Sequence, residues 1–560
     1  MQVAQPPVLP PAAPEAASIL WWQIDIPLGD APLWIGALAS AVAAETGCSG
    51  TLTRRALANP DVPLSTRVAW RVDRAIFGPA RALAPGASDP MSGSTSTSTC
   101  TSTSQRPGGL IVRLVDEADP ASTSFQLTLT VGGLPACRMI EAVEQALSCG
   151  HGSLAVGAQW QAPNAELMGA QRPAKADRPP GGSRQVAEPH FLESVSWQCF
   201  VDERSRCRSL DFVADKLVRL AALMVRRCGS VHNQMPLAVP PGNQRLVAEA
   251  PLRRALRHAV RRLLAHDQWA ITVHQGVAAD VLWPDSAGID LIPPSDRFWA
   301  DPFVLRQGAR LWVFFEDLPY ATQRGHIACV AIDADGEVSE PIAVLEAPCH
   351  LSYPQVFAHQ GQWFMLPESS ARRNLVLYRA RQLPGPWEPV AELLTQVRMA
   401  DATLHHDGAR WWLTASVATD AGCIYDELHL YSADRLEGPW RASPHNPVRV
   451  DPAWSRPAGP WFVWQGRAAR PVQDCRGRYG RALQILTVMG IGDDGVRERP
   501  VASLAARVGG LATGVHTYSR VGSDLAIDWV RWRSRLLSPR VGSQAQVGLA
   551  AAGDGLAARR

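Results

Sequence analysis

Carboxylates recur at matching positions of a segment that the chain repeats. The segment DPFVLRQGARLWVFFED begins at Asp301, and DATLHHDGARWWLTASV, which aligns with it without a gap, begins at Asp401. A third copy, YPQVFAHQGQWFMLPES, begins at Tyr353 and lacks one residue. Weaker copies begin at Gly459 and Val515. Because apolar runs lie on both sides of a glycine turn, each copy predicts two antiparallel strands.

The repeated unit extends into a second pair of strands. The stretch LVLYRARQLPGPWEPV at 375–390 matches LHLYSADRLEGPWRAS at 428–443. Each unit therefore predicts a four-stranded sheet, and a period of roughly fifty residues is typical of sheets that stack and share their apolar faces. Five copies between about residues 270 and 535 predict an all-β five-bladed propeller. A pair of packed β-sandwiches is the alternative for the same strands.

This repeat would gather acidic side chains at one end of the propeller. In each predicted blade the first strand begins, and the second strand ends, at the same mouth of the central channel. The first position holds Asp301 and Asp401, and the second holds Glu316, Glu368 and Asp474. Crowded carboxylates push their pKa values apart, as a general acid and a general base require. An aspartate that starts a strand is also typical of a capped turn, so only their joint placement indicates a site.

Residue types suited to sugar recognition surround these carboxylates. Aromatic faces pack against sugar rings, and arginine, glutamine and aspartate hydrogen-bond to hydroxyl groups. His516, near the fifth strand start, could hold a metal or water, although a structural role is favoured. The predicted catalytic residues are Asp301, Asp401 and Glu368, and the predicted substrate-binding residues are Trp299, Glu316, His350, Tyr353, Arg456, Gln473, Asp474, Arg478 and His516. We predict no metal site and no cofactor.

Composition excludes several classes of protein. The 560 residues include 55 basic and 52 acidic side chains without a long charged block, which argues against a surface for nucleic acid or anionic membrane. The start lacks a secretory pattern, and the apolar stretch at 33–44 is shorter than the ~20 residues of a membrane helix. Eleven cysteines without a C-x-x-C pair indicate free thiols. We therefore expect a cytoplasmic protein without a membrane span.

The length favours more than one domain. Strands within 109–131, a helix at 135–147 and helical spacing from Leu210 predict an α/β domain over 19–235. The basic amphipathic stretch 252–266 predicts a helix within a linker at 236–269, with a membrane-surface role for its arginines as the alternative. The propeller follows at 270–535. Segments poor in large apolar residues predict a disordered start at 1–18, disordered linkers near 93–109 and 169–185, and a disordered tail at 536–560.

From Arg297 to about Asp528 the sequence resembles the N-terminal domain of plant glucosamine inositolphosphorylceramide transferases and its bacterial relatives. The resemblance rests on the motifs FWADPF, FFED, GHIA, HLSYPQVF, DATL, ELHLYSA, GPW, QDCRGRYGRAL and GVHTYS. That domain is similar to the five-bladed propellers of arabinanases, xylosidases and invertases, whose active sites use an Asp base, a second Asp and a Glu acid. The resemblance implies that Asp301 is the base, Asp401 the second Asp and Glu368 the acid.

The N-terminal third resembles the later portion of a formyltransferase domain. The similar parts are PACRMIEAVEQALSCGHGSLAVG and the helix at Leu210. The Asn-His-Asp set expected of a formyltransferase is not recognisable, because His151 and His190 have no matching partner motif. We therefore expect a degenerate α/β domain.

Two functions of different classes follow. The first is hydrolysis of a glycosidic bond by a carboxylate acid and base. The second is a non-catalytic propeller that binds a sugar or glycolipid headgroup for glycan or glycolipid biosynthesis, since the plant proteins carry the transfer chemistry in a separate domain. The sequence leaves the substrate sugar and the oligomeric state open.

Overall fold

The chain forms two compact units, each with its own core. The computed structural model describes residues 21–27, 33–46, 50–55, 109–113, 125–161, 191–228, 265–284, 286–419, 422–504, 512–534 and 546–549. The disordered start at 1–18 and the linker near 169–185 lie outside these residues, as does the linker near 93–109 except for Gly109. Among the described residues, no helix combines the length and apolarity needed to cross a bilayer.

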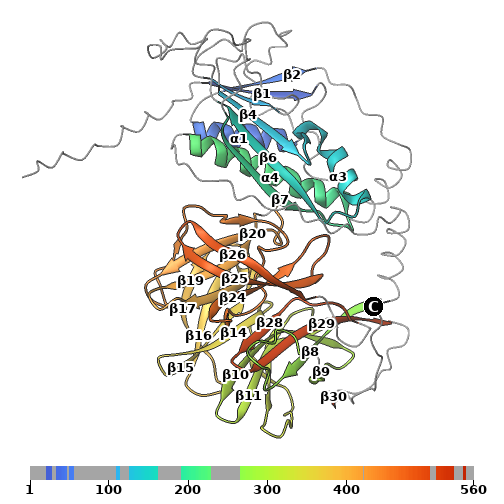
Figure 1. Cartoon of the computed structure of the whole chain (residues 1–560), viewed down its shortest axis with the longest axis vertical. Coiled ribbons are helices and arrows are strands. Elements are labelled where there is room, and N and C mark those ends of the chain that lie inside the picture. Colours follow the sequence, from blue (N-terminus) through green and yellow to red (C-terminus); the bar gives the residue numbers. More distant parts are fainter. Residues whose placement is uncertain are drawn as a thin grey trace, which may run out of the picture. The chain divides into compact units, whose positions relative to one another are not determined.

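The N-terminal unit is an α/β domain, as predicted. Its sheet has the order β2-β1-β3-β4-β6-β7, with β1 to β4 parallel and β6 antiparallel to β4 (Figure 1). The strands are β1 (Trp21–Pro27), β2 (Gly50–Arg55), β3 (Gly109–Arg113), β4 (Phe125–Val131), the short β5 (Leu134–Pro135), β6 (Ser153–Gln161) and β7 (Phe191–Phe200). The helices are α1 (Leu33–Thr46), α3 (Met139–Ser148) and α4 (Arg206–Cys228).

The long helix α4 follows from its apolar spacing. Leu210, Val213, Leu217 and Leu220 recur every three or four residues and are fully buried. A likeness to formyltransferases remains a prediction for this unit.

The C-terminal unit is built from five antiparallel sheets. The first four are consecutive in the sequence. They contain β10 (Arg297–Gln307), β11 (Arg310–Pro319), β12 (His326–Ile332) and β13 (Ile342–Leu345); β14 (Ser352–His359), β15 (Gln362–Glu368), β16 (Asn374–Ala380) and β17 (Glu388–Thr395); β18 (Met399–His406), β19 (Trp411–Val417), β20 (Glu427–Ala433), β21 (Arg441–Ala442) and β22 (Arg449–Val450); and β23 (Phe462–Trp464), β24 (Arg467–Asp474), β25 (Ala482–Gly492) and β26 (Gly495–Leu504). The predicted hairpins of the first four copies thus correspond to the first two strands of these sheets.

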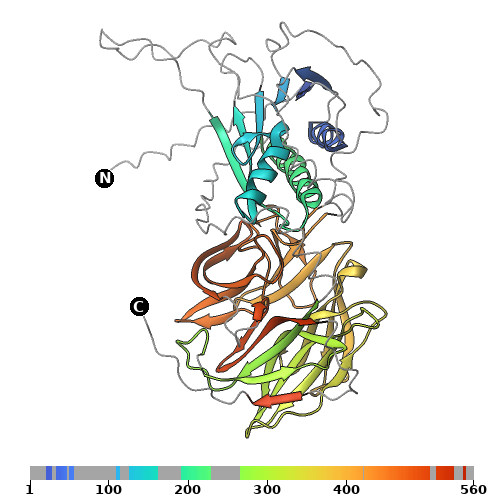
Figure 2. The same ribbon diagram turned by 90° about the vertical axis from the view of Figure 1, so that its right-hand side faces the viewer.

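The fifth sheet combines strands from both ends of the unit. It contains β27 (Ala512–Gly514), β28 (Tyr518–Val521), β29 (Asp524–Ser534), β8 (Ala265–His274), β9 (Ile289–Ile292) and β30 (Gln546–Leu549). An unbroken antiparallel ladder joins β29 to β8, so the orange-red strand lies beside the green one in Figures 1 and 2. The strands that precede the repeats therefore complete the sheet of the fifth copy.

Two boundary predictions need correction. Residues 265–269 belong to β8 and not to a helical linker, because the alternating apolar residues of AHDQWAITVH pair with β29. The rest of the predicted linker, 236–264, lies outside the described residues. Within the tail predicted to be disordered, Gln546–Leu549 forms β30 and pairs with β9, while the other residues of 536–560 are not described.

Five apolar clusters join the five sheets in cyclic order. Each cluster contains side chains from two consecutive sheets, and the fifth sheet packs against both the fourth and the first. Pairs that represent the clusters are, in order, Phe303 with Met365, Phe364 with Leu413, Trp412 with Val496, Leu483 with Ile527, and Ile271 with Val313. The strand starts of neighbouring sheets are thereby held close together.

Candidate active site

A bulge near the start of three strands positions three predicted site residues. The ladder register shifts just after residue 300 in β10, residue 352 in β14 and residue 400 in β18. Asp301, Tyr353 and Asp401 occupy these bulges with φ angles of 52°, 45° and 54°. Positive φ is uncommon for residues with a side chain, and a bulge redirects that side chain. The repeated sequence thus produces a repeated backbone distortion, which turns each residue toward its partners in neighbouring sheets.

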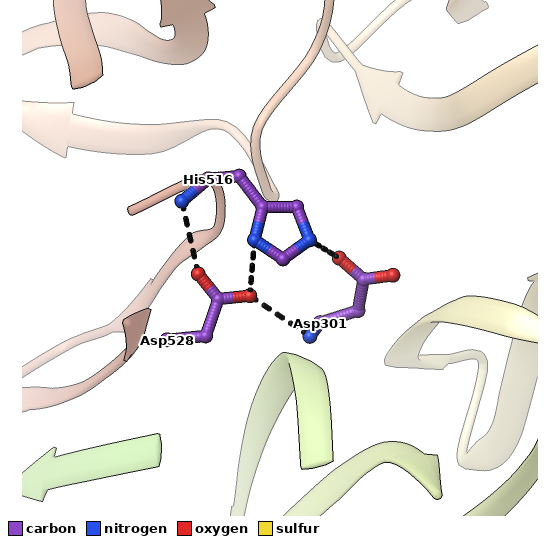
Figure 3. A group of neighbouring side chains, drawn as sticks. All are labelled: Asp301, His516 and Asp528. Carbon is purple, nitrogen blue, oxygen red and sulfur yellow. Dashed lines mark hydrogen bonds and ion pairs between the residues drawn. The ribbon is translucent and has the colours of Figure 1, made fainter. Parts of the chain in front are cut away.

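Asp301 belongs to an ion-pair network with a histidine and a second aspartate (Figure 3). Its Oδ1 lies 3.1 Å from His516 Nε2, and Nδ1 of the same ring lies 2.9 Å from Asp528 Oδ2. Asp301 Oδ1 also accepts a 2.7 Å hydrogen bond from the Thr517 hydroxyl, and Oδ2 accepts one of 3.2 Å from the Tyr353 backbone N–H. Asp301 and His516 are 4% and 2% exposed, so the charges interact with little screening by water.

The two charges fix each other's protonation state. Burial alone would lower the pKa of His516, but the carboxylates of Asp528 and Asp301 raise it to about 10. Burial alone would raise the pKa of Asp301, but the charge of His516 and hydrogen bonds from His516 and Thr517 outweigh burial and lower it. At neutral pH an imidazolium therefore lies between two carboxylates.

The same three side chains have the spacing of a metal site. They present ligand atoms that all lie within 4.8 Å of one another. A metal needs a neutral imidazole with a free lone pair, whereas both ring nitrogens of His516 face carboxylates and its pKa is raised to about 10. Asp528 already accepts backbone hydrogen bonds from His516, Thr517 and Asp301. The arrangement fits a protonated histidine and does not fit a metal ion.

Asp401 is paired with an arginine instead of a histidine. Its Oδ2 accepts hydrogen bonds from Arg456 Nε at 2.5 Å and from Gln473 Nε2 at 2.8 Å. The Arg456 guanidinium lies over the rings of Tyr425 and Tyr479, at 5.2 and 4.8 Å from their centroids. Such cation–π contacts hold the guanidinium in a buried position. The predicted residues Arg456 and Gln473 thus meet in the site, bound to Asp401.

Glu368 is a carboxyl whose pKa is strongly raised by its surroundings. It is partly exposed at the end of β15, and its Oε2 accepts a 2.9 Å hydrogen bond from the Asp401 backbone N–H. Burial and the nearby charge of Asp401 raise its pKa to about 8, against the opposing effect of Arg456. Glu368 is therefore largely protonated at neutral pH.

Glu316 and His350 form another contact between a carboxylate and a histidine. The Glu316 carboxylate lies 3.2 Å from His350 Nε2, while His350 Nδ1 accepts a hydrogen bond from the Gly325 backbone N–H. A Cβ at position 325 would lie 2.8 Å from Glu316 Oε1, so this close approach requires glycine. Burial raises the pKa of Glu316, and contact with Glu316 raises that of His350. The His350 side chain is 39% exposed and can reach a ligand.

These groups lie within electrostatic range of one another. In addition to burial, the charge of Asp301 raises the pKa values of Glu316, Glu368 and Asp401. Tyr353 also connects the sheets, because its hydroxyl accepts a hydrogen bond from the Gly459 backbone N–H and lies 2.9 Å from the Thr403 hydroxyl. Four of the five predicted carboxylates therefore converge.

Two predicted substrate-binding residues have partners other than these groups, and a third lies on a connecting segment. Trp299 is 2% exposed and packs in an apolar cluster, with its ring centroid 5.0 Å from that of Phe315. Asp474 is neutralised by Arg476 and Arg481, each 2.7 Å away. Arg478 is partly exposed between β24 and β25. The first two therefore have roles in packing and in local charge balance.

The sequence reasoning missed several members of the site. Asp528 and Thr517 hold His516 and Asp301, and Tyr479 packs against Arg456 and His516. Asp528 lies in β29, the second strand of the fifth copy, but two positions before Val530, which is the residue aligned with Glu316, so the alignment of strand ends does not identify it.

Part of the chain is similar to a known protein family. Residues 274–508 match the family model for the N-terminal region of glucosamine inositolphosphorylceramide transferase 1. The protein of that name from Oryza sativa subsp. japonica is 33% identical over 209 residues, which cover 37% of this chain and 28% of the rice protein. Its Arabidopsis thaliana namesake is 30% identical over 206 residues, covering 36% and 27%. The matches thus cover less than a third of these curated relatives.

Two glycosidases are among the solved structures that match part of this chain. One is a family 43 β-xylosidase/α-arabinofuranosidase from a compost microbial metagenome, with 11% identity, a TM-score of 0.34, and coverage of 44% of this chain and 93% of that chain. The other is the catalytic domain of a family 62 α-L-arabinofuranosidase from Coprinopsis cinerea, with 14% identity, a TM-score of 0.32, and coverage of 48% and 98%.

Proposed function

We propose that the C-terminal unit is a five-bladed β-propeller that cleaves a glycosidic bond by acid–base catalysis. The cyclic packing of five sheets supports the propeller. The relationship of residues 274–508 to a sugar-transferring glycolipid enzyme supports a carbohydrate as the ligand. Both lines of support concern the C-terminal unit.

One observation carries the chemistry. Glu368 has a pKa raised to about 8, while the pKa of Asp301 is lowered. Two carboxyl groups with pKa values pushed in opposite directions supply a proton donor and a proton acceptor at the same pH.

In the proposed reaction Glu368 and Asp301 each carry out one proton transfer. Glu368 donates its proton to the glycosidic oxygen as the bond to the anomeric carbon breaks. A water molecule attacks that carbon, and its proton passes to Asp301, whose Oδ2 accepts one hydrogen bond from the protein and so retains a free lone pair. The products are two sugars with free hydroxyl groups, and proton exchange with solvent restores both carboxyls. Asp401, held by Arg456, raises the pKa of Glu368.

A hydrolysis screen over defined glycans tests this function. The full chain is compared with Asp301→Asn, Glu368→Gln and the control Asp333→Asn, which changes an aspartate with a 48% exposed side chain. We expect release of reducing sugar by wild type and control, and a loss of about 100-fold or more in each site variant. Equal release by wild type and Asp301→Asn would eliminate Asp301 as the base.

A second candidate is a site that binds a sugar or glycolipid headgroup without cleaving it. The observation that favours it is the Asp401–Arg456–Gln473 group, in which the carboxylate is already satisfied by the protein. Here glycans bind to wild type and to Glu368→Gln with similar affinity, and none is cleaved. Calorimetry with the glycans of the screen separates the two functions.

A further inference from the structure

Two arginines of β29 converge on one neutral oxygen. Arg531 Nη2 donates a 3.2 Å hydrogen bond to Gln268 Oε1, and Arg533 Nη1 donates one of 3.0 Å to the same atom. Gln268 is fully buried, and its Nε2 donates to the backbone oxygens of Pro294 and Arg297. These two bonds fix the amide, so its oxygen is presented to the arginines.

This pair has more positive charge than its protein partners neutralise. Neither guanidinium is within ion-pair distance of a carboxylate in the described part of the chain. Arg531 Nε is buried there without a hydrogen-bond partner, although a buried donor left unpaired is costly. The neighbouring Arg297 shows the contrast, since Asp296 and Asp317 both pair with it.

The surroundings of Arg531 further disfavour its positive charge. Burial and the charge of Arg533 lower the pKa of Arg531, while Tyr320 and Asp290 oppose this. Asp290 accepts a 2.6 Å hydrogen bond from the Thr272 hydroxyl. Both arginines are partly exposed, so a ligand can approach them from solvent.

We propose that Arg531 and Arg533 form a binding site for an oxyanion, either a phosphate or a carboxylate group. Guanidinium groups present paired N–H donors that match the oxygens of these anions, and two of them on one acceptor leave several donors free. An oxyanion bound to the solvent-facing guanidinium donors supplies the missing negative charge. The site lies on the strands that also build the central group, because Trp269 follows Gln268 and its ring contacts that of His516 at 4.0 Å.

Calorimetric titration of the full chain tests the proposal without any glycan. Inorganic phosphate and sodium acetate are the two probes, at constant ionic strength maintained with chloride. The variants are Arg531→Gln, Arg533→Gln and Arg533→Lys, with Arg310→Gln as a control because that arginine is exposed on β11 and pairs with Asp333. Circular dichroism establishes that each variant is folded.

We expect saturable binding of one anion, weakened at least tenfold by Arg531→Gln or Arg533→Gln and unchanged by Arg310→Gln. Arg533→Lys retains the charge but not the fork, so its affinity falls between wild type and Arg533→Gln. Tighter binding of phosphate or of acetate identifies the anion class. Absence of saturable binding for both probes overturns the proposal. Undiminished anion binding by Arg533→Gln also overturns it, and this result is sufficient even if Arg531→Gln does not fold. None of these results depends on glycosidic cleavage.

Discussion

The two aspartates of the site occupy equivalent bulges but have different charge partners. Asp301 lies beside His516 and accepts a hydrogen bond from Thr517, and its pKa is lowered. Asp401 lies beside Arg456, yet burial and the charge of Asp301 raise its pKa, and its own charge helps to raise that of Glu368. The backbone position is thus supplied by the repeat, whereas the protonation state is supplied by neighbours from other sheets.

The site therefore has two halves with separate tasks, a histidine half around Asp301 and His516 and an arginine half around Asp401 and Arg456. The histidine half keeps one carboxylate ionised, and the arginine half keeps one carboxyl protonated. Removing either cation should therefore perturb its own half most strongly.

The largest effect is expected from Arg456→Met. The substitution retains an apolar stem beside Tyr425 and Tyr479 but leaves the buried Asp401 carboxylate without its cation. Loss of one partner of a buried ion pair costs about 3–5 kcal/mol of unfolding free energy. We expect this loss in urea unfolding at neutral pH, and a smaller loss in acid, where Asp401 is protonated.

The matched control is Arg310→Met, which removes an exposed ion pair with Asp333 and should leave stability unchanged. A double variant with Asp401→Asn should recover part of the loss, because no unpaired charge remains. Equal destabilisation by both arginine substitutions would contradict the role of Arg456.

A smaller, pH-dependent effect is expected from His516→Gln. Because the folded pKa of His516, about 10, exceeds its unfolded value, the native state binds more protons between these pH values. Its stabilising effect is complete below the unfolded pKa and is lost as pH rises through about 10. Wild type should lose about 3 kcal/mol relative to His516→Gln between pH 7 and 9, at about 1.4 kcal/mol per pH unit. Parallel stability curves for the two proteins would contradict an imidazolium at this position.

How much of the fold could be predicted from the sequence depends on how far apart in the sequence the interacting residues lie. The β-rich second half and its repeated hairpins were predicted because turn glycines and alternating apolar residues are local signals. The first half of β8, residues 265–269, falls in the predicted linker because the strand that pairs with it is distant in the sequence. The hydrogen bond between Thr272 and Trp529, which are 257 positions apart, shows this distance.

The candidate site could also be predicted from the sequence only in part. Aligned copies identified Asp301, Glu368 and Asp401, because the repeat places the starts of first strands and the ends of second strands at the same side of each sheet. Trp299, two positions before Asp301, is a predicted substrate-binding residue because of its aromatic face. Alternate residues of a regular strand share a face, but the bulge after residue 300 breaks the alternation, and Trp299 packs in the core.

The smallest of these effects is expected from Tyr353→Phe, which keeps the aromatic ring in its apolar cluster and changes hydrogen bonds alone. It removes the hydroxyl that accepts from the Gly459 N–H and contacts Thr403. A buried donor then lacks its partner, at a cost of about 1–2 kcal/mol. Urea unfolding measures the change. Unaltered stability would mean that these hydrogen bonds do not tie the sheets together.

The central claim is that one carboxyl of the site remains protonated at neutral pH beside an ionised one. Infrared difference spectroscopy of wild type against Glu368→Gln, recorded as the pH is raised, tests it by following the band of the protonated carboxyl. We predict a single carboxyl that titrates near pH 8 in wild type and is missing from the variant. A wild-type spectrum in which this band has already disappeared in weakly acidic solution would contradict the account.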